Sequence, residues 1–327
     1  MNTYRTHIYL KPSEEKISYE SPVMLLGSCF TENIGRKMEE LKMPVDINPF
    51  GNIYNPLSIK NSIDILLQKK IFSEQDLFLS NELWSSFYHH SNFSDIVLEN
   101  CLATINKRIE ASHIFLKKAE YLILTFGTSW VYQHKKTGNI VSNCHKLLPS
   151  EFERKKLDVD EIVDVYKDII KNLISFKPNL KIIFTLSPIR HWKDGAVDNM
   201  HSKATLLVAI HKLCEQFSTA HYFPAYEIMM DDLRDYRFYE EDMLHPSSLA
   251  IKYIWDKFSE VFFEKNTVLL QKEIDEIVRA MRHRPVNPEL NSHKIFRQAM
   301  LQKISEMEKK HPFLNLQQEK SFFSDSV

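Results

Sequence analysis

Two short segments of the sequence hold side chains that together could carry out acyl-group chemistry. The first is Leu26-Gly-Ser-Cys-Phe30, in which Ser28 and Cys29 are both candidate nucleophiles. An apolar run precedes this segment and a helical pattern follows it, so both side chains would lie at a helix N-terminus. The free N–H groups and the dipole there would lower the pKa of a cysteine and bind an acyl oxyanion. The alternative is a turn of small residues that holds a buried, inert cysteine.

The second segment is Asp242-Met-Leu-His245, which Pro246 follows. Pro246 disfavours helical geometry at the preceding residue, so we expect the His245 imidazole on an extended segment. An aspartate three residues before a histidine can hold the ring in one tautomer and stabilise the imidazolium that forms when the ring acts as a base. Ser247 or Ser248 would cap the helix that follows. Taken alone, the pattern also fits a surface loop with a capping interaction.

Apolar strands that alternate with amphipathic helices would position these two segments. Short apolar runs predict buried strands at residues 22–26, 121–126, 181–186 and 221–223. Apolar residues that recur every three or four positions predict helices at residues 30–41, 59–67, 94–118, 159–176, 202–218 and 248–263. This alternation predicts an α/β fold, a three-layer sandwich with a mostly parallel central sheet.

Three polar segments follow the carboxyl ends of the predicted strands. They begin at Gly27, Gly127 and Ser187, and the third continues to Arg190 and His191. Ligands bind beyond the carboxyl ends of the strands in sheets of this kind, so we expect the segments to meet at one edge. Arg190 and His191 are candidates for binding substrate oxygen atoms or a carboxylate, with a loop-packing role as the alternative.

The order of these features along the chain resembles that of SGNH or GDSL-like hydrolases. Those enzymes have a nucleophile turn after the first strand and an Asp-x-x-His motif just before the last core helix. Residues 26–31, Leu-Gly-Ser-Cys-Phe-Thr, also resemble the signature that names the GSCFA family, although that name has alanine at the position of Thr31. The resemblance implies an SGNH-hydrolase-like domain over residues 1–265.

The first and last sequence blocks of these hydrolases assign the central roles. The block Gly-Asp-Ser-Leu lies over Gly27-Ser-Cys-Phe30, so Cys29 rather than Ser28 takes the place of the nucleophile. A thiolate beside His245 is a competent nucleophile at neutral pH, whereas a serine needs stronger help from a base. Asp242 and His245 match the last block, which implies that the aspartate orients the histidine. The resemblance favours Cys29, and Ser28 stays open as the alternative.

The two middle blocks imply donors to the oxyanion. Gly51, which Asn52 follows, is similar to the glycine of the second block. The third block, Gly-x-Asn-Asp, lies over residues 127–130, where Ser129 replaces the asparagine and so weakens one donor. The resemblance therefore implies that Gly51, Asn52, Thr128 and Ser129 bind the oxyanion or the substrate.

The resemblance implies an acyl-ester hydrolase that acts on a small-molecule or carbohydrate ester and needs no cofactor or metal. An acyltransferase is the first alternative, because a polysaccharide-acyltransferase family with a Gly-Asn-Cys-Gln turn also places a cysteine at this position. A non-catalytic protein that binds a glycan or a partner is the second alternative, and the replacement at Ser129 favours it.

Two other pairs of polar residues suggest further sites. His89 and His90 make a poor metal pair, because adjacent residues on a strand point to opposite faces. His90 is a candidate for substrate binding, with a structural role as the alternative. Cys144 and His145 are a candidate second Cys/His site, although neighbours in sequence rarely face each other. The cysteines form no C-x-x-C pair, so we predict no metal site.

Composition limits the partners and the location. The chain has 42 Lys and Arg against 43 Asp and Glu, a formal net charge of −1, so we expect no nucleic-acid partner. No stretch approaches the roughly 20 apolar residues of a membrane-spanning helix, so we expect no membrane partner. Residues 1–16 show no signal-peptide pattern. We therefore expect a cytoplasmic protein with reduced thiols.

The pattern changes after residue 265. Residues 266–282 and 293–310 are predicted to form charged helices, and residues 317–327 are polar and expected to fray. We therefore predict a helical C-terminal extension over residues 266–327. Its charged helices would offer a surface for oligomer formation.

Overall fold

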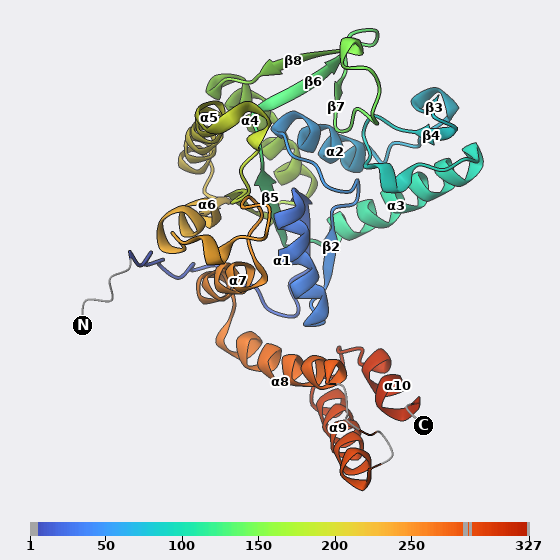
Figure 1. Cartoon of the computed structure of the whole chain (residues 1–327), viewed down its shortest axis with the longest axis vertical. Helices are drawn as coiled ribbons and strands as arrows, with labels where there is room; N and C mark the ends of the chain where they lie inside the picture. The colour runs from blue at the N-terminus through green and yellow to red at the C-terminus, as the bar shows by residue number, and fades with distance from the viewer. Residues whose placement is uncertain (1–5, 284–286, 288–289, 326–327) are drawn as a thin grey trace.

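The computed structural model describes residues 6–283, 287 and 290–325. Within these residues the central sheet has five strands, all parallel, in the order β10-β9-β5-β1-β2 (Figure 1). Its strands are β1 (Val23–Gly27), β2 (Val45–Ile47), β5 (Tyr121–Phe126), β9 (Lys181–Leu186) and β10 (Ala220–Phe223).

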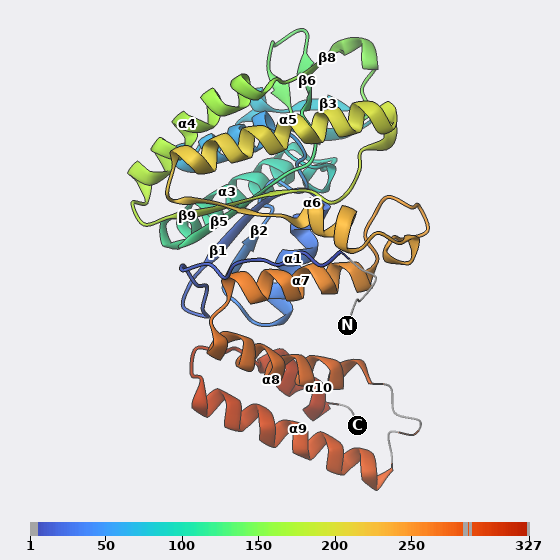
Figure 2. The same cartoon turned by 90° about the vertical axis from the view of Figure 1, so that its left-hand side faces the viewer.

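Helices cover both faces of this sheet, which makes the predicted three-layer α/β sandwich (Figure 2). One layer contains α2 (Pro56–Gln68), α3 (Leu98–Lys118), α4 (Val159–Phe176) and α5 (Gly195–Gln216). The other layer contains α1 (Cys29–Glu40), the short α6 (Ala225–Glu227) and α7 (Ser248–Phe262). Helix α5 begins seven residues earlier than predicted, and α3 begins four residues later.

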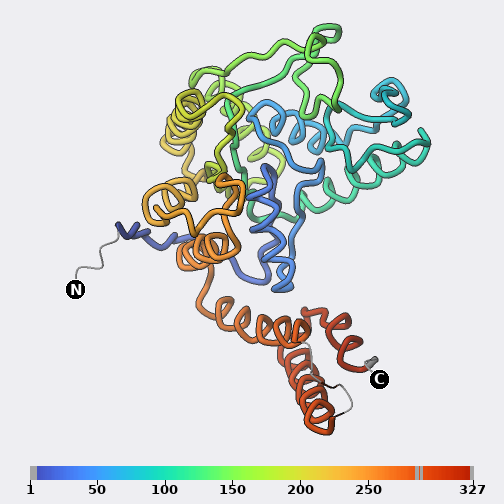
Figure 3. The backbone as a smooth tube through the Cα atoms, viewed as in Figure 1, coloured from blue at the N-terminus to red at the C-terminus, as the bar shows by residue number. Residues whose placement is uncertain are grey.

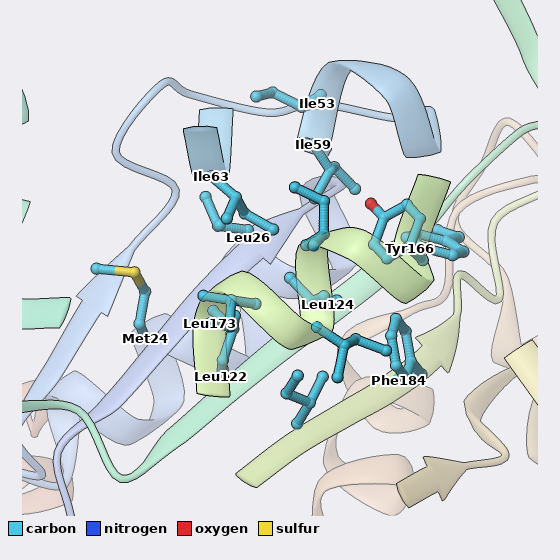
Figure 4. Packing of buried hydrophobic residues seen from close by; sticks show 14 of the residues in the cluster. Met24, Leu26, Ile53, Ile59, Ile63, Leu122, Leu124, Tyr166, Leu173 and Phe184 are labelled. Carbon is cyan, nitrogen blue, oxygen red and sulfur yellow. The ribbon is translucent and has the colours of Figure 1, made fainter. Parts of the chain in front are cut away.

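The sheet separates two hydrophobic clusters because alternate strand residues face opposite layers. Leu122 and Leu124 of β5 pack towards α2–α5, whereas Tyr121 and Ile123 pack towards α1 and α7. Figure 4 shows the first cluster, where Leu124 lies near Tyr166 of α4. Each fully buried large apolar side chain stabilises the fold by about 1.5–3 kcal/mol.

Two small antiparallel sheets flank the central sheet, and the sequence pattern did not predict them. The strands β3 (Phe78–Ser80) and β4 (Leu83–Ser85) form one sheet, and β7-β6-β8 form the other. The second sheet consists of β6 (Trp130–His134), β7 (Ile140–Val141) and β8 (Phe152–Lys156). It follows β5 after three residues, so its position is tied to the carboxyl edge of the central sheet.

Short helical turns connect several of these elements. Turns of 3-10 helix lie at Glu74–Asp76, Ser91–Phe93, Pro149–Glu151, Trp192–Asp194 and Tyr236–Phe238. A π-helical turn, Ile228–Asp232, continues α6. Near the other end of the chain, the Ile17 amide donates to the Phe262 carbonyl at 2.7 Å, so the N-terminal segment lies beside the end of α7 (Figure 3).

The chain ends in three helices that pack against the α1 layer (Figure 2). They are α8 (Lys265–Arg282), α9 (Asn291–Lys310) and α10 (Gln317–Asp325). The Lys37 ammonium of α1 donates to Asp275 at 3.1 Å, and Arg282 donates to Glu40 at 2.7 Å.

The expectation that the chain frays from residue 317 is wrong for residues 317–325, and residues 326–327 lie outside the described part. Phe323 is only 2% exposed and belongs to the same cluster as α1 and α7. Glu319 pairs with Lys42 at 2.6 Å. In the described residues no helix is both long enough and apolar enough to cross a membrane.

Candidate active site

A cavity of about 510 Å³ lies at the carboxyl edge of the central sheet. The turns that follow β1, β5 and β9 all contribute to its wall, and so does the segment before α7. The lining residues from these four segments are Ser28, Cys29, Gly127, Thr128, Ser187, Ile189, Arg190, His191, Trp192, Lys193, Leu244 and His245. We call this space the Cys29 cavity.

Gly27 makes the turn after β1 possible. Its φ angle is +153°, and a Cβ atom there would lie 2.6 Å from the Thr125 carbonyl oxygen and 2.7 Å from the Thr31 hydroxyl. No L side chain fits that space without a shift of the β5 backbone. The Gly27 amide donates to the Asn48 side chain at 2.9 Å, which holds the turn. The next two residues therefore begin α1 directly at the sheet edge.

Ser28 is the N-cap of α1 and is almost completely buried. Its hydroxyl oxygen accepts from the Phe30 amide at 3.3 Å and its hydroxyl donates to Ser187 Oγ at 3.2 Å. The side chain is 1% exposed. Its hydroxyl is thus committed to capping the helix and to a hydrogen bond within the protein.

Cys29 is the first residue of α1 and is half-buried in the cavity wall. Burial raises the pKa of its thiol above the usual 9.0, although the Cys29 and Phe30 amides and the Lys203 cation act in the opposite direction. The sequence-based expectation of a lowered pKa is therefore wrong. Desolvation of the thiolate outweighs the helix N-terminus at this position.

Asp242 holds His245 in one orientation. Its Oδ2 accepts from His245 Nδ1 at 2.5 Å, and its Oδ1 accepts from the Leu244 and His245 amides at 2.8 and 2.9 Å. The His245 amide and ring and the Leu244 amide lower the pKa of Asp242 to about 2. An ionised Asp242 can only accept, so Nδ1 carries the proton and Nε2 of the neutral ring is left as the basic nitrogen. Ser247, not Ser248, caps α7 through the Ala250 amide at 3.4 Å.

His245 and Cys29 line the same cavity, but their side chains are not hydrogen-bonded to each other. Among the described residues, no hydrogen bond joins the His245 ring to Cys29 Sγ or Ser28 Oγ. The His245 side chain is 50% exposed, on a loop in which Met243 has a φ of +60°. A hydrogen bond between base and nucleophile therefore requires a shift of one of the two side chains, and catalytic hydrogen bonds in other enzymes tighten in this way on substrate binding.

Lys203 is a charged group that sequence reasoning missed. It lies on α5, is 1% exposed, and donates from Nζ to the Ser187 carbonyl at 2.7 Å. Burial lowers the pKa of Lys203 to about 7, whereas the Cys29 thiolate raises it. The available signal was its position on the buried stripe of α5, in phase with Leu206 and Ile210.

The two residues predicted from the third block have different positions. Thr128 lines the Cys29 cavity, and its backbone amide donates to the Tyr54 carbonyl at 3.0 Å. Ser129 is fully buried and is not part of the wall. Its amide and hydroxyl donate to Ser202 Oγ at 2.8 and 3.1 Å. Ser129 therefore cannot donate to an oxyanion in this arrangement, which corrects the sequence-based role.

Gly51, Asn52 and His90 line a different cavity, between α1, β2 and α3. The Gly51 amide donates to the Asn48 carbonyl at 2.7 Å, and Asn52 Nδ2 donates to Glu32 at 2.9 Å. These donors are used within the protein, the first inside the loop and the second on α1. The structure does not bring them to Cys29, so their predicted roles at the oxyanion are not met. The Cys29 amide, at the first position of α1, is the backbone donor that remains near the nucleophile.

Of the other two candidate pairs, His89-His90 and Cys144-His145, only Cys144 lines the Cys29 cavity. His89 is 1% exposed and its ring packs near those of Phe50, Phe72 and Phe93; burial lowers its pKa to about 3. His145 bonds through Nε2 to the Ser86 carbonyl at 2.8 Å, whereas Cys144 lines the Cys29 cavity. In the described residues no group of three or more His, Cys, Asp or Glu is arranged to hold a metal ion.

The outer wall of the cavity comes from the β7-β6-β8 sheet. Trp130 and Tyr132 of β6 and Arg154 of β8 line it. The Arg154 guanidinium lies 4.0 Å from the Trp130 ring centroid and donates to Asp194 at 2.6 Å. The antiparallel sheet thus contributes aromatic and cationic side chains to the wall of the cavity.

Comparison with solved structures finds carbohydrate esterases at low similarity. The carbohydrate esterase family 3 structure from Talaromyces cellulolyticus has 13% identity and a TM-score of 0.35, over 77% of this chain and 99% of that chain. The Clostridium thermocellum family 3 carbohydrate esterase has 11% identity and a TM-score of 0.34, over 80% of this chain and 99% of that chain. An acetyl xylan esterase from Butyrivibrio proteoclasticus has 10% identity and a TM-score of 0.37, over 74% of this chain and 63% of that chain.

Sequence families give a firmer result. No curated protein matches the chain. The model described as "GSCFA domain protein, C-terminal domain" matches residues 274–327, which include the second half of α8 together with α9 and α10. The model of the GSCFA family matches residues 22–258, from the residue before β1 to the last third of α7. Because that match covers more than half of the chain, the protein belongs to the GSCFA family.

Proposed function

We propose that the protein is an acyl hydrolase that cleaves an ester bond with Cys29 as its nucleophile. One observation carries the proposal: a single cavity holds Cys29 at the N-terminus of α1 and His245 in the orientation that Asp242 imposes. Nucleophile, base and orienting acid are the three groups that covalent acyl chemistry requires.

In the first step Cys29 Sγ bonds to the acyl carbon, and the ester C–O bond breaks. His245 Nε2 takes the thiol proton and delivers it to the departing alcohol oxygen, so protons balance. The Cys29 amide at the start of α1 donates to the oxyanion of the tetrahedral intermediate. Water then attacks the Cys29 thioester, His245 takes its proton, and an acid and the free thiol are released.

Two contacts favour Cys29 over Ser28. The Ser28 hydroxyl accepts from the Phe30 amide and donates to Ser187, so attack by Ser28 would break the hydrogen bond that caps α1. The loss of an N-cap costs about 1 kcal/mol and is avoided if Cys29 attacks. Lys203 supports the same choice, because its ammonium lowers the thiol pKa and so favours the thiolate.

Single substitutions with a panel of acyl esters test the proposal. Cys29→Ala and His245→Ala should each abolish ester cleavage, whereas Cys214→Ala, a control at a partly buried cysteine outside the cavity, should not. Intact-mass measurement during turnover should find one acyl group on the protein, and mass spectrometry of its peptides should locate that group on Cys29. Full activity of His245→Ala would refute the mechanism. An acyl group that passes to a sugar faster than to water would make the protein an acyltransferase instead.

A non-catalytic binding protein is the second candidate, because no hydrogen bond joins His245 to either nucleophile among the described residues. The two functions differ in the reactivity of Cys29. Labelling by a thiol-directed acylating probe that is lost in His245→Ala supports catalysis. Absence of labelling together with intact binding of an ester or a glycan supports the binding protein.

A further inference from the structure

The wall of the Cys29 cavity is basic. Arg154, Arg190 and Lys193 line it together with two histidines, and none of its described lining residues is an aspartate or a glutamate. A low-dielectric cavity lined by one sign of charge concentrates ions of the opposite sign. The net charge of the whole chain, −1, does not predict this local imbalance.

Among the residues that the structure describes, a carboxylate pairs with only one of these cations. Arg154 binds both carboxylate oxygens of Asp194 through its two terminal nitrogens. That pairing raises the pKa of Arg154 and lowers that of Asp194. Both terminal nitrogens of Arg154 bind Asp194, and its guanidinium stacks 4.0 Å from the Trp130 ring centroid. Arg154 is therefore part of the wall rather than a free binding group.

Arg190 has no such partner within the described residues. It lies in the loop between β9 and α5, and its Nε is buried with no hydrogen-bond acceptor. Its guanidinium lies 5.5 Å from the ring centroid of Trp192, another lining residue. Buried polar groups are hydrogen-bonded in the large majority of cases, so an unsatisfied guanidinium beside a cavity points to an acceptor that comes from outside the chain.

The loop that carries Arg190 is fixed by the protein. The His191 amide donates to Asn199 Oδ1 at 2.9 Å, and the Ile189 amide donates to Ser187 Oγ at 3.4 Å. Lys193, on the same loop, donates to the Tyr132 hydroxyl at 2.9 Å, and no carboxylate of the described residues forms an ion pair with it. A preorganised loop therefore presents two uncompensated cations to the space in front of Cys29.

We propose that the substrate carries a carboxylate near its ester bond and that Arg190 binds this carboxylate, with Lys193 at the rim. The planar fork of an arginine matches the two oxygens of a carboxylate. The carboxylate belongs either to the acyl group, as in a half-ester of a dicarboxylic acid, or to an acidic sugar. The ester substrate rests on the proposed function, but binding of an anion at Arg190 does not depend on turnover.

Alkylation of Cys29 tests the subsite without a known substrate. Iodoacetate and iodoacetamide share a leaving group and differ in charge, so the ratio of their rates at Cys29 reports a nearby cation. We expect this ratio to exceed that of N-acetylcysteine by about tenfold, the effect of 1.4 kcal/mol. Arg190→Gln should bring the ratio close to that of the free thiol. Arg36→Gln, which removes an arginine of the other cavity, should keep it high.

Two further measurements show whether the carboxylate belongs to the acyl group or to a sugar. One of them, the melting temperature, also tests the subsite if Cys29 does not react. Succinate and glucuronate are tested for protection of Cys29 from iodoacetamide and for a rise in the melting temperature of the wild type. Protection or stabilisation by succinate alone assigns the carboxylate to the acyl group, and by glucuronate alone to a sugar. An effect that persists in Arg190→Gln, or a flat alkylation ratio with no effect of either acid, overturns the proposal. If ester cleavage fails while the ratio holds, the subsite stands and only the hydrolase is lost.

Discussion

The Lys203 ammonium and the Ser187 carbonyl oxygen are joined by a hydrogen bond of 2.7 Å at the end of β9. The lysine is 1% exposed, and no carboxylate of the described residues pairs with it. The charges of Lys203 and Cys29 interact: the ammonium lowers the pKa of the thiol, and the thiolate raises the pKa of the lysine. A cation buried without a counter-ion favours a thiolate in the same region.

This arrangement predicts how stability depends on pH. The folded-state pKa of Lys203 is about 7, below its usual 10.5, so the unfolded chain holds a proton there that the folded chain has lost. Between these values the free energy of unfolding of the wild type should rise with pH relative to Lys203→Met, by about 1 kcal/mol per pH unit. Below pH 7 both states are protonated, so the difference should be constant.

Urea unfolding of the two proteins from pH 6 to pH 9.5 measures the effect. Lys212→Met is the matched control, because Lys212 lies on the same helix but is exposed and pairs with Asp160. Its curve should stay parallel to that of the wild type. A parallel curve for Lys203→Met would show that the buried lysine does not titrate in this range.

Cys29 should react slowly at neutral pH. Because burial raises its pKa above 9.0, the rate of alkylation by iodoacetamide should still increase beyond pH 9. Lys203→Met should leave the midpoint close to that of the wild type, because Lys203, with a pKa of about 7, is already neutral where Cys29 titrates. Mass spectrometry of the Cys29 peptide follows the rate. A plateau at pH 7 would contradict the prediction, and Cys214, whose pKa is raised to about 12, provides a slower internal reference.

Asp242→Asn should impair the proposed reaction far more than it alters the fold. Asparagine can donate to His245 Nδ1 and so favour the wrong tautomer, which lowered kcat about 10⁴-fold in a serine protease. We expect a loss of at least 10²-fold in kcat. With a pKa of about 2, Asp242 stays ionised from pH 5 to pH 9 and adds no limb to the pH profile of the wild type there. A variant with unchanged kcat would remove Asp242 from the mechanism.

Gly27→Ala should destabilise the protein by about 2–4 kcal/mol, because it combines a clash with backbone strain. The added Cβ would lie 2.6 Å from the Thr125 carbonyl oxygen. Gly138→Ala separates the two causes: Gly138 also has a positive φ, +72°, but the nearest atom to its Cβ is 4.0 Å away. We expect a loss of about 1 kcal/mol there. Equal losses in urea unfolding would show that the close approach of β1 and β5 is unimportant.

Continuous apolar runs explain why much of the fold could be predicted. The strand limits at residues 121–126 agree with β5, and those at residues 181–186 agree with β9, because a strand buried on both faces is apolar throughout. The strands β6–β8 were missed because they are short or rich in polar residues that are only partly buried. Helix α10 was missed because Phe323 is a single buried aromatic in a polar segment.

The site was predictable where chemistry and local sequence coincide. Asp242 and His245 are three residues apart, so their contact is local. The depth of Lys203 depends on how distant segments pack, which one lysine in a sequence does not reveal. The pKa of Cys29 has the same origin, since the neighbours that desolvate it come from other elements.

The packing of α10 affects the order of events during biosynthesis. Phe323 shares a cluster with Phe30 and Ile34 of α1, the helix that begins with Cys29. Residue 323 leaves the ribosome long after α1, so this layer stays incomplete until α10 has been made. Nascent chains halted before α10 should therefore expose Cys29 to alkylation faster than the released protein. Equal rates would mean that the α1 layer is complete before the last helix is made.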